Sequence, residues 1–149
     1  MATHQLCTFF LDNAFFGIDV RLVQEVIRYQ EMTRVPSSSP VISGLINLRG
    51  QIVTAVDMRK RLGLPDRPAD RLPMNVVVRS EGGPYSLLVD EIDDVVEVDE
   101  RQFEPVPDTL PARMRELVKG IYKLDNGPLL LELASDRDTI IGLRKEAIV

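Results

Sequence analysis

Residues 44–57 of the chain read Gly44-Leu45-Ile46-Asn47-Leu48-Arg49-Gly50-Gln51-Ile52-Val53-Thr54-Ala55-Val56-Asp57. β-branched and apolar residues suit a pleated surface, so the part from Gln51 to Asp57 predicts a β-strand. Gly44 and Gly50 predict tight backbone positions where one strand passes to the next. A phosphate-binding loop is the alternative, but no Lys-Ser/Thr pair follows and apolar residues occupy the cradle positions. The stretch therefore predicts a fold built from strands.

Short strands separated by turn signals continue on both sides of this stretch. Three hairpins are predicted, over 6–20, 74–90 and 120–133. Segment 92–98 predicts an extended chain, and the prolines in 33–40 and 103–107 predict loops or edge strands because proline lacks a backbone donor. About ten short strands with few helices predict small barrels or a sandwich.

A helical spacing follows the first hairpin. Val20, Val23, Val26 and Ile27 recur at steps of three and four, which predicts a short helix with Asp19 as its N-cap. Further short helices are predicted over 58–64 and 111–119, and in the tail over 138–148.

Composition limits the class of protein. With 149 residues, 44% of them hydrophobic and 28% charged, the chain predicts one soluble globular domain. A net charge of -5 argues against non-specific nucleic-acid binding, and we interpret Arg59-Lys60-Arg61 as a solvated surface. Cys7 is the only cysteine, which excludes an intramolecular disulfide. No signal peptide and no apolar run of roughly 20 residues is present, which predicts a cytoplasmic protein without direct membrane insertion.

Residues suited to catalysis are few. His4, the only histidine, lies in a segment expected to fray, and Cys7 lies in a strand pattern that predicts a small buried side chain. The cluster Asp90-Glu91-Ile92-Asp93-Asp94 predicts a solvated turn at a strand end. The alternative is a metal-dependent enzyme using Asp90, Asp93 and Asp94, but the cluster lacks calcium-loop spacing. The sequence thus predicts no enzyme, no metal and no cofactor.

Arg49 is unusual among apolar neighbours. A buried arginine is seldom left unpaired, so Arg49 either bonds backbone carbonyls across a packed junction or presents its guanidinium to a partner.

From residue 44 to Arg59 the chain resembles the most characteristic stretch of the CheW family of chemotaxis coupling proteins. Other segments match the family in the order in which its pattern runs. Before residue 44 they are Phe16-Gly17-Ile18-Asp19-Val20 and Val23-Gln24-Glu25-Val26-Ile27, and after Arg59 they are Leu88-Val89-Asp90-Glu91-Ile92 and Gly120-Ile121. Thr54 replaces the usual proline, and Ser86 stands where glycine is common. The resemblance runs from about Leu6 to Leu133.

The resemblance implies a mainly β fold of two SH3-like five-stranded barrels packed together, forming a single domain over 1–149. The expected subdomains are 14–82, and 5–13 plus 83–149. It further implies a non-catalytic adaptor that couples the tips of methyl-accepting chemoreceptors to the regulatory domain of the histidine kinase CheA. Carried over by position, the partner-binding residues are Val23, Glu25, Gly44, Arg49 and Val95. A coupling protein of a non-chemotactic motility or developmental pathway is the alternative.

Overall fold

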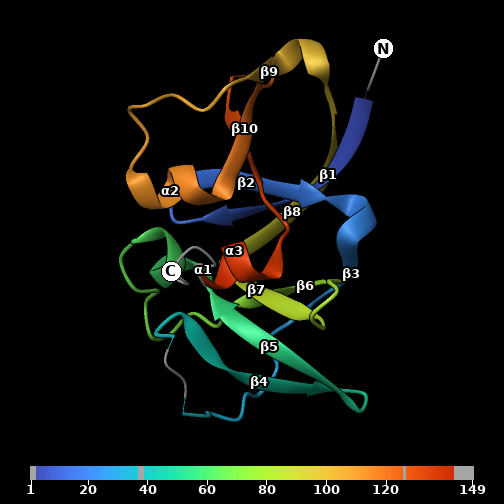
Figure 1. Cartoon of the computed structure of the whole chain (residues 1–149), viewed down its shortest axis with the longest axis vertical. Coiled ribbons are helices and arrows are strands. Elements are labelled where there is room, and N and C mark those ends of the chain that lie inside the picture. Colours follow the sequence, from blue (N-terminus) through green and yellow to red (C-terminus); the bar gives the residue numbers. More distant parts are fainter. Residues whose placement is uncertain (1–2, 37–38, 126, 143–149) are drawn as a thin grey trace, which may run out of the picture.

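The computed structural model describes residues 3–36, 39–125 and 127–142, which form two sheets stacked along the long axis of the molecule (Figure 1). The first sheet has six strands in the order β8-β1-β2-β11-β10-β9. Its strands are β1 (Thr3–Leu11), β2 (Ala14–Asp19), β8 (Glu91–Asp99), β9 (Phe103–Glu104), β10 (Val118–Lys123) and β11 (Leu129–Leu133).

The second sheet has five strands in the order β3-β6-β7-β5-β4. Its strands are β3 (Val23–Ile27), β4 (Ile42–Leu48), β5 (Gln51–Asp57), β6 (Met74–Val78) and β7 (Tyr85–Val89). Parallel pairs occur once in each sheet, between β2 and β11 and between β5 and β7, and the other pairs are antiparallel.

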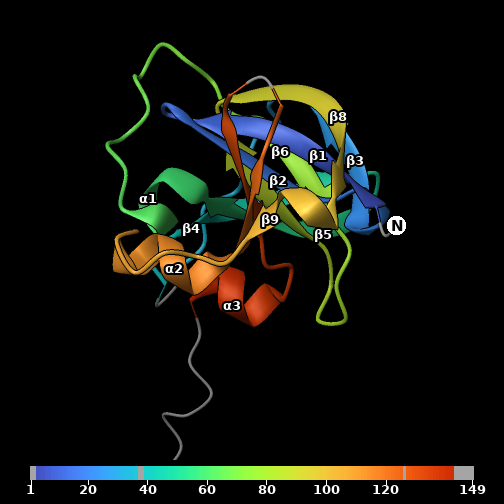
Figure 2. The ribbon, with the colours of Figure 1, turned by 90° about the horizontal axis from the view of Figure 1, so that it is seen from above.

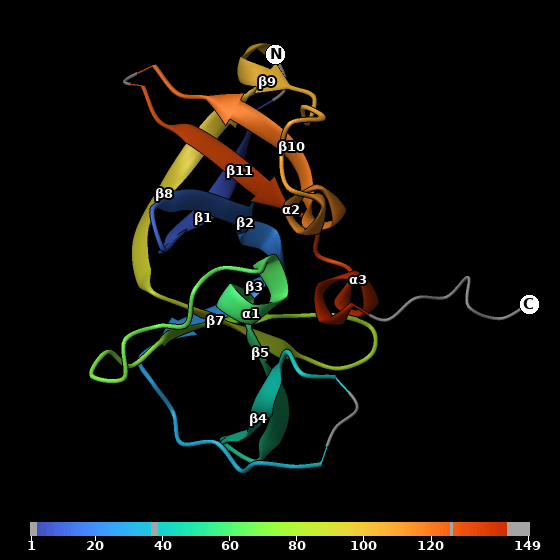
Figure 3. The same ribbon diagram turned by 90° about the vertical axis from the view of Figure 1, so that its left-hand side faces the viewer.

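Three short helices gather on one side of the molecule, near the junction of the sheets (Figures 2 and 3). They are α1 (Met58–Leu62), α2 (Ala112–Leu117) and α3 (Arg137–Ile141). Arg61 fastens α3 to α1: its Nε donates to the carbonyl of Ile140 at 2.8 Å, and its Nη2 donates to that of Thr139 at 3.0 Å. The carbonyls of the last helical turn lack the usual i→i+4 partners. The guanidinium supplies a donor to Ile140 and a second donor to Thr139, whose carbonyl also accepts from the backbone nitrogen of Gly142 at 3.2 Å.

The largest core cluster lies between the sheets. It combines Phe9 and Phe16 of the six-stranded sheet with Val56, Tyr85 and Leu87 of the five-stranded sheet. Each sheet also encloses a smaller cluster of its own. Because both faces of β7 are covered, all five of its residues are buried. This double coverage explains the nearly continuous apolar run at 85–89, in which the one polar side chain, Ser86, donates to Asn75 Oδ1 at 2.7 Å.

The mainly β fold with a few short helices is confirmed, but the sheets are not closed barrels. Both strand orders among the described residues are linear, and one sheet has six strands rather than five. The sheets also divide the chain at other limits than the expected ones. Segment 14–19, expected in the first subdomain, pairs with β1 and β11, and segment 85–89, expected in the second, pairs with β5 and β6.

The predicted helix around Val20–Ile27 is wrong. A single 3-10 turn, Val20–Leu22, is followed by β3, although Asp19 does cap that turn by accepting from the backbone nitrogen of Arg21 at 2.9 Å. Val23 pairs with Val78 and Glu25 with Val77, so Gln24 is an extra residue in the strand. A bulge of this kind shifts the alternation by one position, and apolar residues then recur at the spacings of a helix.

The other predicted elements are found close to their expected limits. The three hairpins correspond to β1–β2, β6–β7 and β10–β11, and helices lie at 58–62, 112–117 and 137–141. Residues 143–148 of the predicted tail helix and Asn126 of the last turn lie outside the described residues.

Candidate functional site

Arg49 stands at the tip of the β4–β5 hairpin. Leu48 pairs with Gln51, so Arg49 and Gly50 alone form the turn, with φ angles of 54° and 87°. A two-residue turn with both φ angles positive matches the right-handed twist of the strands. The side chain of Asn47 supports it by accepting from the backbone nitrogen of Gly50 at 2.9 Å. Asn47, Arg49 and Gly50 therefore have separate roles in one turn.

The turn contacts β3 through two side-chain pairs. Arg49 Nη2 donates to the carboxylate of Glu25, and Gln24 Nε2 donates to Gln51 Oε1 at 3.2 Å. The strand β3 is one edge of the five-stranded sheet, and these contacts join it to the turn after β4 and to the first residue of β5, with which it is not paired in the strand order. A short bridge between Thr33 and Leu45 adds a third connection. The sheet is thus strongly curled and is joined partly by side chains.

Gly44 makes that bridge possible. A Cβ atom built on Gly44 would lie 2.7 Å from the carbonyl oxygen of Thr33. That same oxygen accepts from the backbone nitrogen of Leu45 at 2.9 Å. Any side chain at Gly44 would therefore displace the segment that contains Thr33.

The remaining predicted site residues lie apart from this turn. Val23 is half-buried against the main core, and its carbonyl oxygen accepts from Arg79 Nη1 at 3.1 Å. Val95 belongs to β8, an edge strand of the other sheet, where it pairs with Cys7 and is 50% exposed. The structure therefore brings Glu25 and Arg49 together and places Val95 on a separate surface.

Arg49 itself is not buried among its apolar neighbours. Its side chain is 68% exposed, against 22% for Glu25. Of the two expectations for Arg49, the one that requires a packed junction does not fit this exposure. The guanidinium donates to Glu25 through Nη2, and the rest of it is exposed at the surface, where a partner could contact it.

A second polar cluster, around Asp90, differs from what the sequence predicts. Asp90 accepts from Arg59 through Nε at 3.0 Å and Nη2 at 2.7 Å, from Arg67 Nε at 3.2 Å, and from the backbone nitrogen of Asp12 at 2.7 Å. We call these groups the Asp90 cluster. The side chains of Asp90 and Arg59 are 9% and 8% exposed. Neither the solvated turn expected at Asp90 nor the solvated surface expected at Arg59 is correct.

The signal for this cluster was present in the sequence. Asp90 directly follows β7, all of whose residues are buried, and Arg59 follows the buried Met58 and the end of β5 where Ala55 and Val56 are buried. A charged residue at such a position needs a partner of opposite charge. Burial alone would raise the pKa of Asp90, but hydrogen bonds from Arg59 and Asp12 and the nearby guanidiniums lower the pKa below its ordinary value.

This arrangement argues against the alternative of a metal-dependent enzyme, because Asp90 would be one of its ligands. Both carboxylate oxygens of Asp90 already accept from donors that carry positive charge or a backbone N–H. Asp93 and Asp94 are exposed on β8, and within the described ranges no three His, Cys, Asp or Glu side chains converge on one point. A divalent cation at Asp90 would have to displace two guanidiniums.

His4 and Cys7 are both held in β1. His4, expected to be frayed, pairs with Val98, and its Nε2 lies 3.4 Å from Glu132 Oε1 and 3.3 Å from the Tyr122 hydroxyl. Cys7 is half-buried, and burial followed by the charge of Asp19 raises the pKa of its thiol. A raised pKa disfavours the reactive thiolate.

Comparison with known proteins gives a single family. Residues 5–137 match the model of the CheW-like domain. The chain is 30% identical over 122 residues to the chemotaxis protein CheW of Bacillus subtilis (82% of this chain and 78% of that protein), and 29% identical over 123 residues to that of Klebsiella aerogenes (83% and 74%). The crystal structure of the scaffolding protein TtCheW from Thermoanaerobacter tengcongensis superposes with a TM-score of 0.79 at 28% identity, covering 91% of each chain.

Proposed function

The chain belongs to the CheW-like domain family of non-catalytic scaffold proteins, and we propose that it couples methyl-accepting chemoreceptors to the histidine kinase CheA in chemotaxis. The observation that carries the proposal is the exposed guanidinium of Arg49 at the tip of the β4–β5 hairpin, paired with the half-buried Glu25 of β3. In this proposal the pair and its surroundings recognise the receptor.

An energetic comparison supports recognition over a purely structural role for Arg49. A non-glycine residue in the left-handed region costs roughly 1–2 kcal/mol. An exposed ion pair stabilises a protein by only about 0.2–1 kcal/mol. The two-residue turn sets the positive φ of Arg49, but glycine would adopt it without this cost, so the presence of arginine at this position is better explained by what its side chain binds than by what it stabilises.

The kinase would bind elsewhere, on the six-stranded sheet. Its edge strands β8 and β9 expose apolar side chains, Val95 at 50% and Phe103 at 43%. Apolar groups at unpaired sheet edges are suited to protein contacts. Arg49 lies in a turn of the five-stranded sheet, and Val95 lies in the six-stranded sheet. We therefore propose that the receptor and the kinase bind the protein at the same time, on separate surfaces.

A pull-down with purified CheA and a receptor signalling fragment tests the proposal. The wild-type protein is expected to bind both, and Arg49→Ala to lose the receptor fragment while retaining the kinase. Arg101→Ala is the control for receptor binding, because Arg101 is 72% exposed, is also paired with a carboxylate, that of Asp99, and lies between β8 and β9 of the other sheet. If the folded wild-type protein binds neither partner, the proposed function is wrong.

A charge reversal separates recognition from stability. The double variant Glu25→Arg with Arg49→Glu restores an ion pair of the opposite polarity within the protein. Receptor binding that stays lost in this variant indicates direct recognition of the guanidinium. Full recovery of binding would mean that the pair serves only to hold β3 against the turn.

We also propose that the receptor brings the protein to the membrane array. Across the parts of the chain that the structure describes, no helix combines the length and the apolar character needed to cross a bilayer. In cells, a fluorescent fusion is expected at receptor clusters, and Arg49→Ala to disperse it.

A further inference from the structure

The negative charge of the chain is concentrated along one edge of the six-stranded sheet. Residues 91–104 form β8, a 3-10 turn at Glu100–Gln102 and β9, and they contain seven carboxylates and one cation, Arg101. This segment therefore has a net charge of -6, while the whole chain has -5, so all other residues together carry +1. We call it the acidic edge. Figure 3 shows β8 rising along one side of the molecule from β7 to the turn before β9.

We propose that the acidic edge is the docking surface for a basic face of the kinase, with lysine or arginine side chains around an apolar centre. The inference rests on the proposed adaptor function and adds to it the chemistry of the partner. The apolar centre of that face would contact the exposed side chains of Val95 and Phe103, and its cations would face the surrounding carboxylates.

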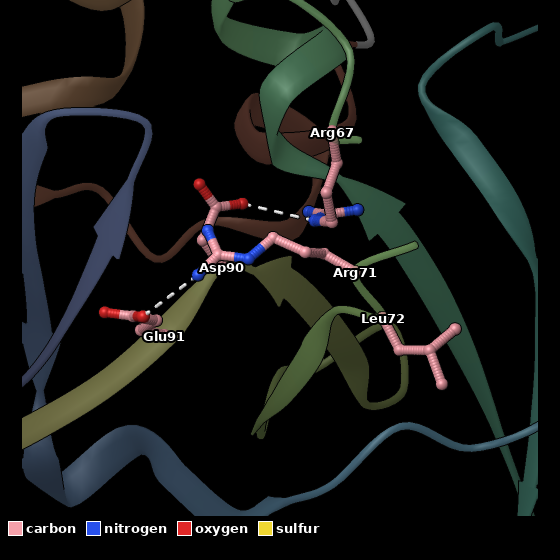
Figure 4. A pocket seen from close by; sticks show the side chains of 5 residues that line it. All are labelled: Arg67, Arg71, Leu72, Asp90 and Glu91. Carbon is pink, nitrogen blue, oxygen red and sulfur yellow. Dashed lines mark hydrogen bonds and ion pairs between the residues drawn. The ribbon is translucent and has the colours of Figure 1, made fainter. Parts of the chain in front are cut away.

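The first argument is that ion pairs within the protein do not neutralise this segment. Three of its seven carboxylates have a cation partner: Glu91 with Arg71, Asp99 with Arg101 and Glu104 with Lys123. Figure 4 shows the first of these pairs. Among the residues that the structure describes, the other four carboxylates are exposed and form no ion pair: Asp93, Asp94, Glu97 and Glu100. The second lysine of the nearby β10, Lys119, is paired with Glu132, so four negative charges remain without a counter-ion.

The second argument is the open edge of the sheet. In the strand order of the described residues, β8 and β9 are the two outer strands, and β8 is nine residues long. Proteins protect such edges from association with charges and bulges, and β8 has an irregularity opposite Thr8. Protection does not explain why Val95 is 50% exposed and Phe103 43% exposed on the same edge. An apolar centre within a polar rim is instead typical of a protein interface.

The third argument is that the exposed ring of Phe103 is already held in place. A Cβ atom built on Gly120 would collide with this ring, so the ring lies flat against a strand that has no side chain there. It also meets the buried ring of Tyr122 edge to face, with the centroids 5.5 Å apart. A side chain fixed before binding loses little rotamer entropy on binding, and aromatic residues held in this way are common anchors of interfaces.

Charge decides which occupant fits this edge. Four uncompensated carboxylates attract a cationic surface over a distance and repel anionic lipids and nucleic acids. A second copy of this chain offers little complementary charge, because its residues outside the acidic edge carry only +1. A basic face on the kinase matches both the charge and the apolar side chains, and the attraction would mainly raise the rate of association.

Binding of the protein to immobilised CheA, followed in real time at several concentrations of NaCl, tests the proposal. The association rate constant of the wild type should fall about tenfold or more between roughly 20 and 500 mM NaCl, because salt shortens the range of the attraction. The dissociation rate constant should change much less. Arg101→Gln removes the only cation of the acidic edge, so it should speed association at the lower salt concentration.

A charge reversal with a matched control locates the effect. Asp93→Lys with Glu97→Lys should slow association about tenfold at the lower salt concentration and match the wild type at the higher one. Glu31→Lys with Glu81→Lys makes the same change in net charge at exposed residues beside the five-stranded sheet. This control should stay within about twofold of the wild type.

The wild-type measurement keeps the test decisive whether or not the variants fold. Association that does not depend on salt, or a deficit of the folded reversal variant that persists at the higher salt concentration, would overturn the inference and leave the adaptor function standing. A folded wild-type protein that does not bind CheA would overturn both. Self-association of the protein alone in sedimentation experiments, abolished by the reversal, would assign the acidic edge to a second copy and overturn the inference.

Discussion

Replacement of Asp90 by asparagine removes one charge from the Asp90 cluster and changes almost no volume. The amide cannot accept on both of its groups, and its NH₂ would face donors that now contact a carboxylate oxygen. The two guanidiniums of Arg59 and Arg67 lose their shared counter-ion. Arg59 also donates to the carbonyl of Pro65 at 2.9 Å, so the loop beyond α1 loses part of its support.

The size of the effect follows from burial. With Asp90 9% exposed and Arg59 8% exposed, the pair belongs with buried ion pairs. Removing one partner of such a pair costs about 3–5 kcal/mol. We expect the lower end, a loss of about 3 kcal/mol in the free energy of unfolding, because the cluster borders an open pocket. For a chain of this length that loss lowers Tm by roughly 6–12 °C.

Urea unfolding followed by circular dichroism measures the loss. Asp93→Asn is the control, since Asp93 is exposed on the following strand, and it should change stability by less than about 0.5 kcal/mol. A loss below about 1 kcal/mol for Asp90→Asn, with an unchanged denaturant slope, would refute the buried-pair reasoning.

Acid should remove the difference between wild type and Asp90→Asn. The pKa of Asp90 is lowered in the folded state, so its stabilisation is complete above the unfolded carboxyl value of about 3.9 and is lost as the pH falls through the folded pKa. The stability gap measured at pH 7 is therefore expected to narrow below about pH 4. A gap that stays constant to pH 2 would contradict this assignment of the charge.

Three further predictions concern other parts of the fold. Gly44→Ala should lower the free energy of unfolding by about 1–3 kcal/mol, because the added Cβ would meet the carbonyl of Thr33. Gly82→Ala is the control: its Cβ would lie 3.4 Å from the nearest atom, so it should be nearly neutral in the same urea assay. Burial, with the charge and hydrogen bond of Glu132, raises the pKa of Tyr122 to about 12. The stability that the protonated Tyr122 adds to the fold is therefore complete below pH 10 and is lost toward pH 12. The tyrosinate absorbance should contain a step near pH 12 that Tyr122→Phe removes. Arg61→Ala should release α3 from α1 and speed amide hydrogen exchange over 137–142 by roughly tenfold or more, with little change in β6.

The strands were predictable where turn residues and apolar runs agreed. Gly83, with a φ of 105°, and Pro84 mark the β6–β7 turn, and the fully buried β7 is apolar at every position except Ser86. The helix predicted at 20–27 failed because the bulge at Gln24 is a property of pairing with β6, which the local sequence does not display. Strand order was also beyond local reasoning, since the parallel contact of β2 with β11 joins residues more than a hundred positions apart.

The candidate site was predictable only through its resemblance to a family. That resemblance pointed to Glu25 and Arg49, and the structure adds their ion pair and the turn that presents it. The Asp90 cluster escaped because each half looked like a common surface feature: a basic run at Arg59 and an acidic run at Asp90. Their contact depends on how β5 and β7 pair in parallel, so the two partners are neighbours in space and distant in sequence.

The order of strands has a consequence for synthesis on the ribosome. All strands of the five-stranded sheet lie between Val23 and Val89, so that sheet is complete as soon as β7 emerges. The hairpin of β1 and β2 is made first, yet it must wait with both edges unpaired until β8 and β11 arrive on either side of it. Asp90 is the first residue after β7. It accepts from the backbone of Asp12, in the turn of that hairpin, and from the side chain of Arg59 in α1. Once it is made, Asp90 supplies the acceptor that links the early hairpin to Arg59.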